Sequence, residues 1–180
     1  GLEALNERRK VLTEQVLASA EEQIQREPSL LDHSVLVLDH PTWPAGVIGI
    51  VANRLADRYK RPAILLATPS GEPAHGSARS VEGIHLTEAL ATQADMLRSY
   101  GGHGQAAGLA LDPERIAEFR RRVSSAVSLQ LAEGEAKPSL AVDADGNLEE
   151  YPAEPQLFVS IASDCSGDEY EFPDPGDDTG

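Results

Sequence analysis

The stretch SVLVLDHPTWPAGVIGIVANRLADRYKRPAILLA, residues 34–67, decides the fold. Its two ends, 34–38 and 63–67, are short and almost continuously apolar, which is typical of strands buried on both faces. Between them, a turn rich in Pro leads into a run with helical spacing, so we expect a helix that begins near Gly46. Strand, helix and strand in this order predict a βαβ unit and therefore an α/β domain.

Further elements flank this unit on both sides. The residues before it read as one long amphipathic helix without Gly or Pro, and those after it alternate between apolar runs and turn residues. The sequence therefore predicts a compact, mixed-sheet α/β domain preceded by a long linking helix. The expected elements are a helix over 3–26, a strand rich in small residues over 74–80, a helix over 86–98, a strand over 106–111 and a last helix from Asp112-Pro113 to about 132.

Charge is distributed unevenly along the 180 residues, whose net charge is −15. Residues 1–135 hold 14 Lys and Arg against 18 Asp and Glu, whereas residues 136–180 hold one against 12. The expected organisation is a linking helix over 1–30, an α/β domain over 31–134 and a tail over 135–180. The tail is acidic and rich in Pro, with the composition of an irregular, disordered or truncated segment.

Composition also excludes several classes of protein. A pI of about 4.6 excludes a generic histone-like DNA binder, although the nearly balanced body leaves room for a local basic pocket. The single cysteine, Cys165, excludes an intrachain disulfide and a CxxC metal site. No apolar stretch approaches the ~18 residues of a membrane span and no signal peptide is visible, so we expect a cytoplasmic protein without a membrane partner.

Two clusters of residues stand apart from the core pattern, at 75–80 and 101–108. Taken alone, the first reads as a polar edge strand and the second as a helix C-cap glycine pair followed by a turn. Together they predict a phosphate-binding pocket, since Arg offers a planar fork, Ser hydroxyls donate, and a Gly pair exposes backbone N–H groups. The predicted nucleic-acid contacts are His75, Ser77, Arg79, Ser80, Gly101, Gly102, His103, Ala106, Ala107 and Gly108.

Four motifs in this order carry a family resemblance. They are GVIGIVANRL at 46–55, HGSARSVEG at 75–83, LTEAL at 86–90 and GGHGQAAG at 101–108. With them, the chain resembles the DHHA1 domain, in the form found in RecJ-type single-strand-specific exonucleases of the DHH phosphoesterase superfamily. The resemblance covers about residues 3–132.

The resemblance implies one half of a two-part enzyme. In that family a DHH domain binds manganese or magnesium and hydrolyses the phosphodiester, while DHHA1 closes the groove and holds the strand. Ser77 and Arg79 would then contact phosphate, with 101–108 as the cradle. No Asp-His-His occurs in the chain, so we expect no catalytic residue, metal ligand or cofactor here. The expected partners are a DHH domain in cis and single-stranded DNA, with RNA as the alternative strand.

The implied function is the strand-binding module of a RecJ-like 5′–3′ exonuclease acting in DNA repair and recombination. Two other readings stay open. DHHA1 domains also occur in phosphoesterases that cleave oligoribonucleotides or cyclic dinucleotides, and in editing proteins that resemble part of alanyl-tRNA synthetase. Alternatively, the chain is a non-catalytic interaction domain whose acidic tail masks or mimics nucleic acid.

Overall fold

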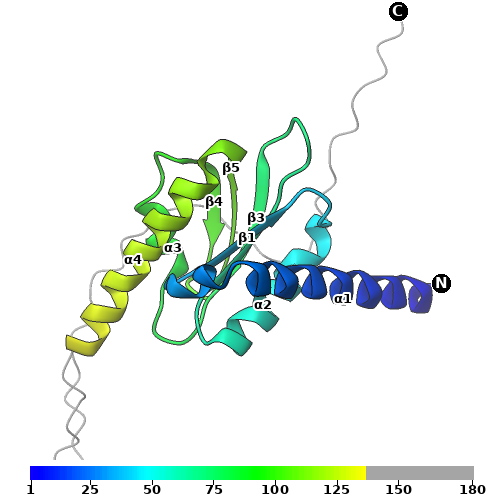
Figure 1. Cartoon of the computed structure of the whole chain (residues 1–180), viewed down its shortest axis with the longest axis horizontal. Coiled ribbons are helices and arrows are strands. Elements are labelled where there is room, and N and C mark those ends of the chain that lie inside the picture. The colour runs from blue at the N-terminus through cyan, green and yellow to red at the C-terminus, as the bar shows by residue number, and fades with distance from the viewer. Residues whose placement is uncertain (137–180) are drawn as a thin grey trace, which may run out of the picture. The chain divides into compact units, whose positions relative to one another are not determined.

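The computed structural model describes residues 1–136, and the expected tail lies almost entirely outside them. Within them, the mixed α/β fold with a long first helix is confirmed (Figure 1). The helices are α1 (Leu2–Arg26), α2 (Ala45–Tyr59), α3 (Leu86–Ala91) and α4 (Ile116–Ala136); the strands are β1 (Leu36–His40), β2 (Ala63–Ala67), β3 (Ala74–Arg79), β4 (Leu97–Gly102) and β5 (Ala106–Leu111); single 3-10 turns span Pro28–Asp32 and Pro113–Arg115.

The five strands form one sheet in the order β1-β2-β3-β5-β4. β1 and β2 are parallel and joined through α2, as the βαβ pattern predicts, and the remaining neighbours are antiparallel. β2 with β3 and β4 with β5 are pairs of consecutive strands, whereas β3 pairs with β5 across the intervening α3 and β4. The sheet is therefore mixed, with its parallel pair at the β1 edge.

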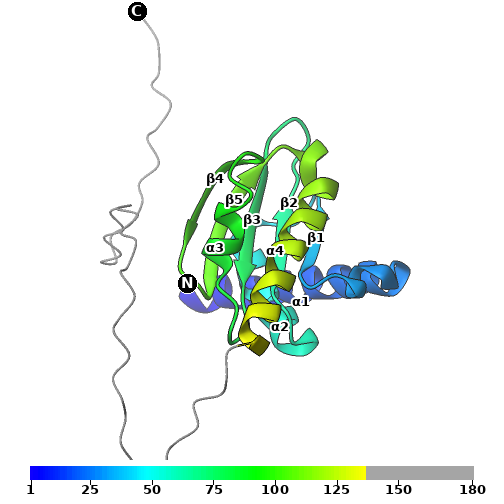
Figure 2. The same ribbon diagram turned by 90° about the vertical axis from the view of Figure 1, so that its left-hand side faces the viewer.

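Helices cover both faces of the sheet, and each face has its own hydrophobic core. One core joins α1 and α2 to side chains of β1 and β2 such as Leu38 and Leu65. The other joins α3 and α4 to side chains such as Ile64, Leu109 and Phe119. Figures 1 and 2 show the sheet between α2 and α4. Residues one apart on a strand therefore face different helices.

The outer edge of β1 is closed by one side chain of α4. Arg120 donates from Nε to the Val37 carbonyl oxygen at 3.1 Å, and its Nη2 lies 3.5 Å from Asp39 Oδ1. An unpaired strand edge is a site for unwanted strand pairing, and a charged side chain across it prevents that. Arg120 therefore contacts other residues of the domain and stabilises the edge of its sheet.

The expected helix over 86–98 is wrong in its second half. α3 ends at Ala91, and the chain turns before β4 begins at Leu97 and pairs with β5. The apolar residues that predicted one long helix are still buried, because Leu90 of α3 and Met96 of the following turn both pack in the core. Pairing with β5 supplies β4 with backbone hydrogen bonds that the helix period could not reveal.

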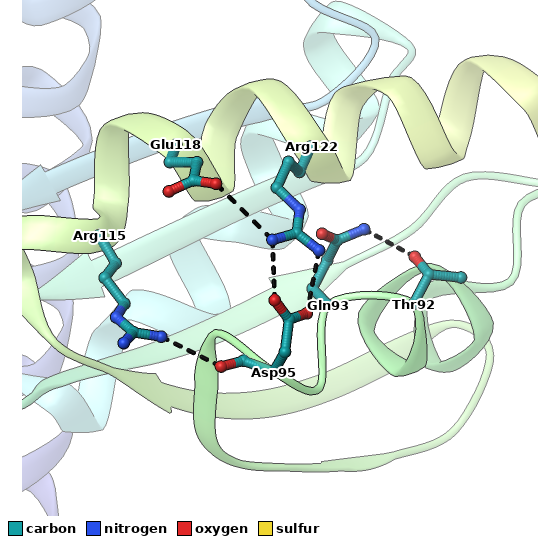
Figure 3. Close-up of polar contacts among 6 residues, drawn as sticks. All are labelled: Thr92, Gln93, Asp95, Arg115, Glu118 and Arg122. Carbon is teal, nitrogen blue, oxygen red and sulfur yellow. Dashed lines mark hydrogen bonds and ion pairs between the residues drawn. The ribbon is translucent and has the colours of Figure 1, made fainter.

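The turn between α3 and β4 is held against α4 by a cluster of charges (Figure 3). Asp95 accepts two hydrogen bonds of 2.9 Å from the guanidinium of Arg122, and Arg115 donates to the Asp95 carbonyl oxygen at 3.0 Å. The hydrogen bond from Arg122 lowers the pKa of Asp95 below its ordinary value. This bidentate pair fixes where β4 begins.

The last helix opens at Asp112 and Pro113 as expected, through a 3-10 turn and without the side-chain cap. The Asp112 carboxylate instead accepts a 2.7 Å hydrogen bond from Arg98 Nε on β4.

Among residues 1–136, no helix is both long and apolar enough to cross a membrane.

Candidate nucleic-acid interface

The residues of β3 with odd numbers share one face of the sheet with α2. His75, Ser77 and Arg79 lie directly across from Ala67, Leu65 and Ala63 of β2, which pack in the core beneath α1 and α2. The pleat places side chains of directly paired residues on the same side. The expectation that Ser77 and Arg79 point to one face is confirmed.

The same rows continue across β5 and β4, where the side chains become very small. Ser77 pairs with Gly108, and Gly108 with Gly101; Arg79 pairs with Ala106, and His75 with Ala110. Gly108 is exposed, and Gly101 and Ala106 are half-buried. Since α2 packs on β2 and β3, this part of the sheet presents a flat ledge beside Ser77 and Arg79, which we call the small-residue ledge (Gly101, Ala106, Gly108).

Arg79 lies against the first turns of α2, at a position without a side chain. A Cβ added at Gly49 would lie 2.7 Å from Arg79 Nη2 and 3.5 Å from Ser77 Oγ, so the guanidinium and the hydroxyl approach the helix backbone together. Arg79 Nη1 donates to the Ala78 carbonyl oxygen at 2.8 Å. No ion pair within residues 1–136 involves Arg79. Its charge is therefore held in place without being neutralised.

Three of the sequence-predicted contacts lie elsewhere. Ser80 donates its hydroxyl to the Ile84 carbonyl oxygen at 2.8 Å and thereby holds the loop before α3. Ala107 is buried in the core beneath α3 and α4. Gly102 pairs with Ala107 and takes a φ of +135° where the chain enters the hairpin turn. These three residues support the loop, core and turn around the site, and they do not share the face of Ser77 and Arg79.

The two remaining histidines stand at opposite ends of the site. His75 is exposed at the start of β3, beside the half-buried Ser77 and Arg79 on the same face. His103 is exposed in the turn between β4 and β5, where its backbone N–H donates to the Ala106 carbonyl oxygen at 2.7 Å. The structure thus gathers His75, Ser77, Arg79 and the small-residue ledge on one face, with His103 at its end.

Trp43 is a packing residue and no stacking platform. It is 5% exposed in the core beneath α1 and α2, and its indole N–H donates to Ser19 Oγ at 3.1 Å. His40 stacks on it with ring centroids 5.6 Å apart. The aromatic pair closes the turn that leads into α2.

Sequence reasoning missed Gly49 as a member of the site. A glycine in a helix interior disfavours the helix by about 1 kcal/mol relative to alanine, so its presence there marks a close approach by another group. The other glycine of α2, Gly46, lies in the first turn of the helix and has open space around its position. The difference between the two appears only when Arg79 is placed beside the helix.

Gly49→Ala is expected to uncouple stability from strand binding. The new methyl group displaces the end of the flexible Arg79 side chain, so the fold survives, and the better helix former adds up to about 1 kcal/mol to the free energy of unfolding. Binding of single-stranded DNA should fall severalfold. Urea unfolding and fluorescence anisotropy measure the two quantities, with Gly46→Ala as the matched control. Equal binding by both variants would contradict the placement of Arg79.

Comparison with known proteins now assigns the fold. The family model described as the DHHA1 domain matches residues 32–129, more than half of the chain. The chain belongs to the DHHA1 domain family. The matched range begins just before β1 and ends in α4, so this DHHA1 domain is the sheet with α2, α3 and most of α4, and α1 precedes it.

Curated relatives of this DHHA1 chain are named single-stranded-DNA-specific exonuclease RecJ. That of Bacillus subtilis is 34% identical over 163 residues, covering 90% of this chain and 20% of the relative. That of Escherichia coli is 33% identical over 185 residues, covering 97% of this chain and 31% of the relative. The chain thus spans between a fifth and a third of the length of these relatives.

Solved structures agree with this. A RecJ from Thermus thermophilus in complex with Mg²⁺ superposes with a TM-score of 0.59 at 34% identity, over 71% of this chain and 19% of that one. An exonuclease RecJ bound to manganese gives 0.60 at 35% identity, over 71% of this chain and 30% of that one. In residues 1–136 of the present chain, no three His, Cys, Asp or Glu side chains gather as metal ligands.

Proposed function

We propose that this DHHA1 domain holds single-stranded nucleic acid by its phosphate backbone, as the binding module of a RecJ-like 5′–3′ single-strand DNA exonuclease in DNA repair and recombination. One observation carries the proposal: the guanidinium of Arg79, which has no ion pair within residues 1–136, and the Ser77 hydroxyl lie together against α2, directly beside the small-residue ledge. The similarity to RecJ exonucleases supports the proposal that such a surface serves the hydrolysis of single-stranded DNA.

The chemistry of the face suits a sugar–phosphate chain. A guanidinium and a hydroxyl donate to phosphate oxygens and position a strand without reading its sequence. The small-residue ledge lets the backbone of a ligand approach the sheet, and His75 and His103 add donors at its two ends. Single-stranded DNA is the proposed ligand, with RNA as the other strand that this chemistry accepts.

Hydrolysis belongs in this proposal to a DHH domain in cis. Two-metal hydrolysis requires carboxylate and imidazole ligands that hold ions about 3.5–4 Å apart. Manganese or magnesium in that domain is supported by the RecJ structures that contain these ions. The proposed role of the present residues is to present the strand to that centre, in the cytoplasm.

The length of the bound strand tests the proposal. Fluorescence anisotropy with oligothymidylates is expected to show an affinity that rises from a dinucleotide through several nucleotides and falls steeply with salt. Saturation at the dinucleotide would instead indicate the small-substrate phosphoesterases. If no strand of any length bound even at low salt, both readings would be wrong, and the chain would instead be an interaction domain.

A further inference from the structure

A second polar pocket lies on the side of the sheet opposite Arg79. It is formed by the segment around Ser34, just before β1, and by α4. The inner face of α4 packs on the core beneath α3 and α4, on the side of the sheet away from α2. Its volume is about 550 Å³, and it is widely open to solvent. We call it the serine pocket; it is lined by Asp32, His33, Ser34, Arg121, Ser124, Ser125, Ser128 and Leu129.

The serine pocket is already assembled by hydrogen bonds between its two sides. The Ser34 N–H donates to Ser124 Oγ at 2.7 Å, and the hydroxyl oxygens of Ser34 and Ser128 are 2.5 Å apart. Arg61 holds the segment before Ser34 by donating to the His33 carbonyl oxygen at 2.9 Å. The walls therefore do not have to be ordered when a ligand binds, which lowers the entropic cost of binding.

Two hydroxyl hydrogens in this pocket have no acceptor among residues 1–136. Ser124 Oγ accepts from a backbone N–H, and no hydrogen bond donated by its own O–H is found. In the pair of Ser34 and Ser128, which is exposed, one hydroxyl donates to the other and the second hydrogen is available to solvent or to a ligand. Ser124 is only 7% exposed. A buried hydroxyl that lacks an acceptor favours a ligand that brings one.

Arg121 differs from both of its neighbours in sequence. Arg120 is paired with Asp39, and Arg122 with Asp95, whereas no ion pair within the described part of the chain involves Arg121. Its side chain is exposed and lines the serine pocket. Two of the three consecutive arginines thus hold the fold together, and the third is available to an external anion.

We propose that the serine pocket binds a phosphate group carried by a nucleotide, independently of Arg79. Arg121 supplies the planar fork, and the free hydroxyls of Ser124 and of the Ser34–Ser128 pair supply further donors. Leu129, which is 66% exposed, offers apolar contact to the sugar or base. Asp32 also lines the pocket and opposes an anion, so inorganic phosphate alone should bind only with a dissociation constant of about 1 mM.

Amide NMR of the full chain tests this site, in an Arg79→Ala background so that the first site is silent. Inorganic phosphate, added to about 20 mM at constant ionic strength, is expected to shift the amides of Ser34, Ser124 and Ser128. Arg121→Ala should weaken this binding by about tenfold, Ser128→Ala by less, and Arg26→Ala, an exposed control paired with Glu22, not at all. Chloride alone should produce no such shifts.

Two further titrations identify what carries the phosphate. Thymidine 5′-monophosphate that binds more tightly than phosphate assigns the site to a free mononucleotide. A 5′-phosphorylated strand that binds more tightly still assigns it to a strand end. Esters that bind no better than inorganic phosphate would overturn the nucleotide assignment. The site itself would be overturned if phosphate left these amides unshifted or if Arg121→Ala left the shifts unchanged.

Discussion

Arg79→Ala is expected to weaken binding of single-stranded DNA by about tenfold, the loss that follows from removing one charge-assisted phosphate contact. The guanidinium lies against Gly49 beside Ser77, and its charge is unpaired within residues 1–136. Its removal should leave the fold intact because the side chain is half-buried and carries only one hydrogen bond, to its own neighbour. The measurement is fluorescence anisotropy at several salt concentrations.

The salt dependence identifies the contact as one to phosphate. For single strands, each neutralised phosphate contributes about 0.7 to the slope of log K against log salt, so the variant should show a slope smaller by about that amount. The loss should be the same for strands of different sequence. Arg79→Lys keeps the charge without the planar fork and should bind with intermediate affinity.

Arg54→Ala is the matched control for this experiment. Arg54 is an exposed arginine of α2 whose partner is Glu14 of α1, so its removal deletes the same charge away from the ledge. Its effect on binding should be small, since Arg54 is already paired with Glu14 and does not line the ledge. Equal losses for Arg54→Ala and Arg79→Ala would mean that binding depends on overall charge alone, and the proposed site would be wrong.

The sequence predicted the first half of the sheet because that half is locally encoded. The apolar runs of β1 and β2 and the helix between them carry their own periodicity, and a βαβ unit has few alternative arrangements. β4 was missed because its residues are exposed at a sheet edge and carry little apolar pattern. Its pairing with β5 depends on partners that only the hairpin brings together.

For the candidate site, the sequence indicated which strand residues share a face, but not which helix they approach. Ser77 and Arg79 share a face because they are two residues apart on a strand, and the same alternation excludes Ser80 from that face. Gly49 could not be assigned, since its contact with Arg79 joins two elements whose relative position no local pattern gives. The site is therefore a product of packing between α2 and β3.

Gly102→Ala is expected to cost roughly 3 kcal/mol in the free energy of unfolding. Gly102 has a φ of +135°, and an added Cβ would lie 2.4 Å from the Ala106 carbonyl oxygen and 2.7 Å from the Ala107 Cα. Both are backbone atoms of the paired strand, so neither can move aside as a flexible side chain would. The turn that His103 closes on Ala106 must then rearrange.

Rearrangement of that turn would spread to the rest of the site. The carbonyl oxygens of Gln105 and Gly104 accept hydrogen bonds of 2.9 Å from the N–H groups of Ser80 and Leu86, so the turn joins the end of β3 to the start of α3. Strand binding should fall together with stability. Urea unfolding gives the free energy, and binding should be measured well below the unfolding midpoint.

Two glycine controls separate the causes of this loss. Gly71→Ala meets a positive φ of +78° in open space and should lose only about 1 kcal/mol, the usual cost of a left-handed residue. Gly101→Ala has open space and no positive φ, so its stability should be nearly unchanged. Because Gly101 lies on the small-residue ledge, its variant should lose strand binding alone. If Gly102→Ala were as stable as Gly101→Ala, the hairpin turn would not be the rigid end of the site.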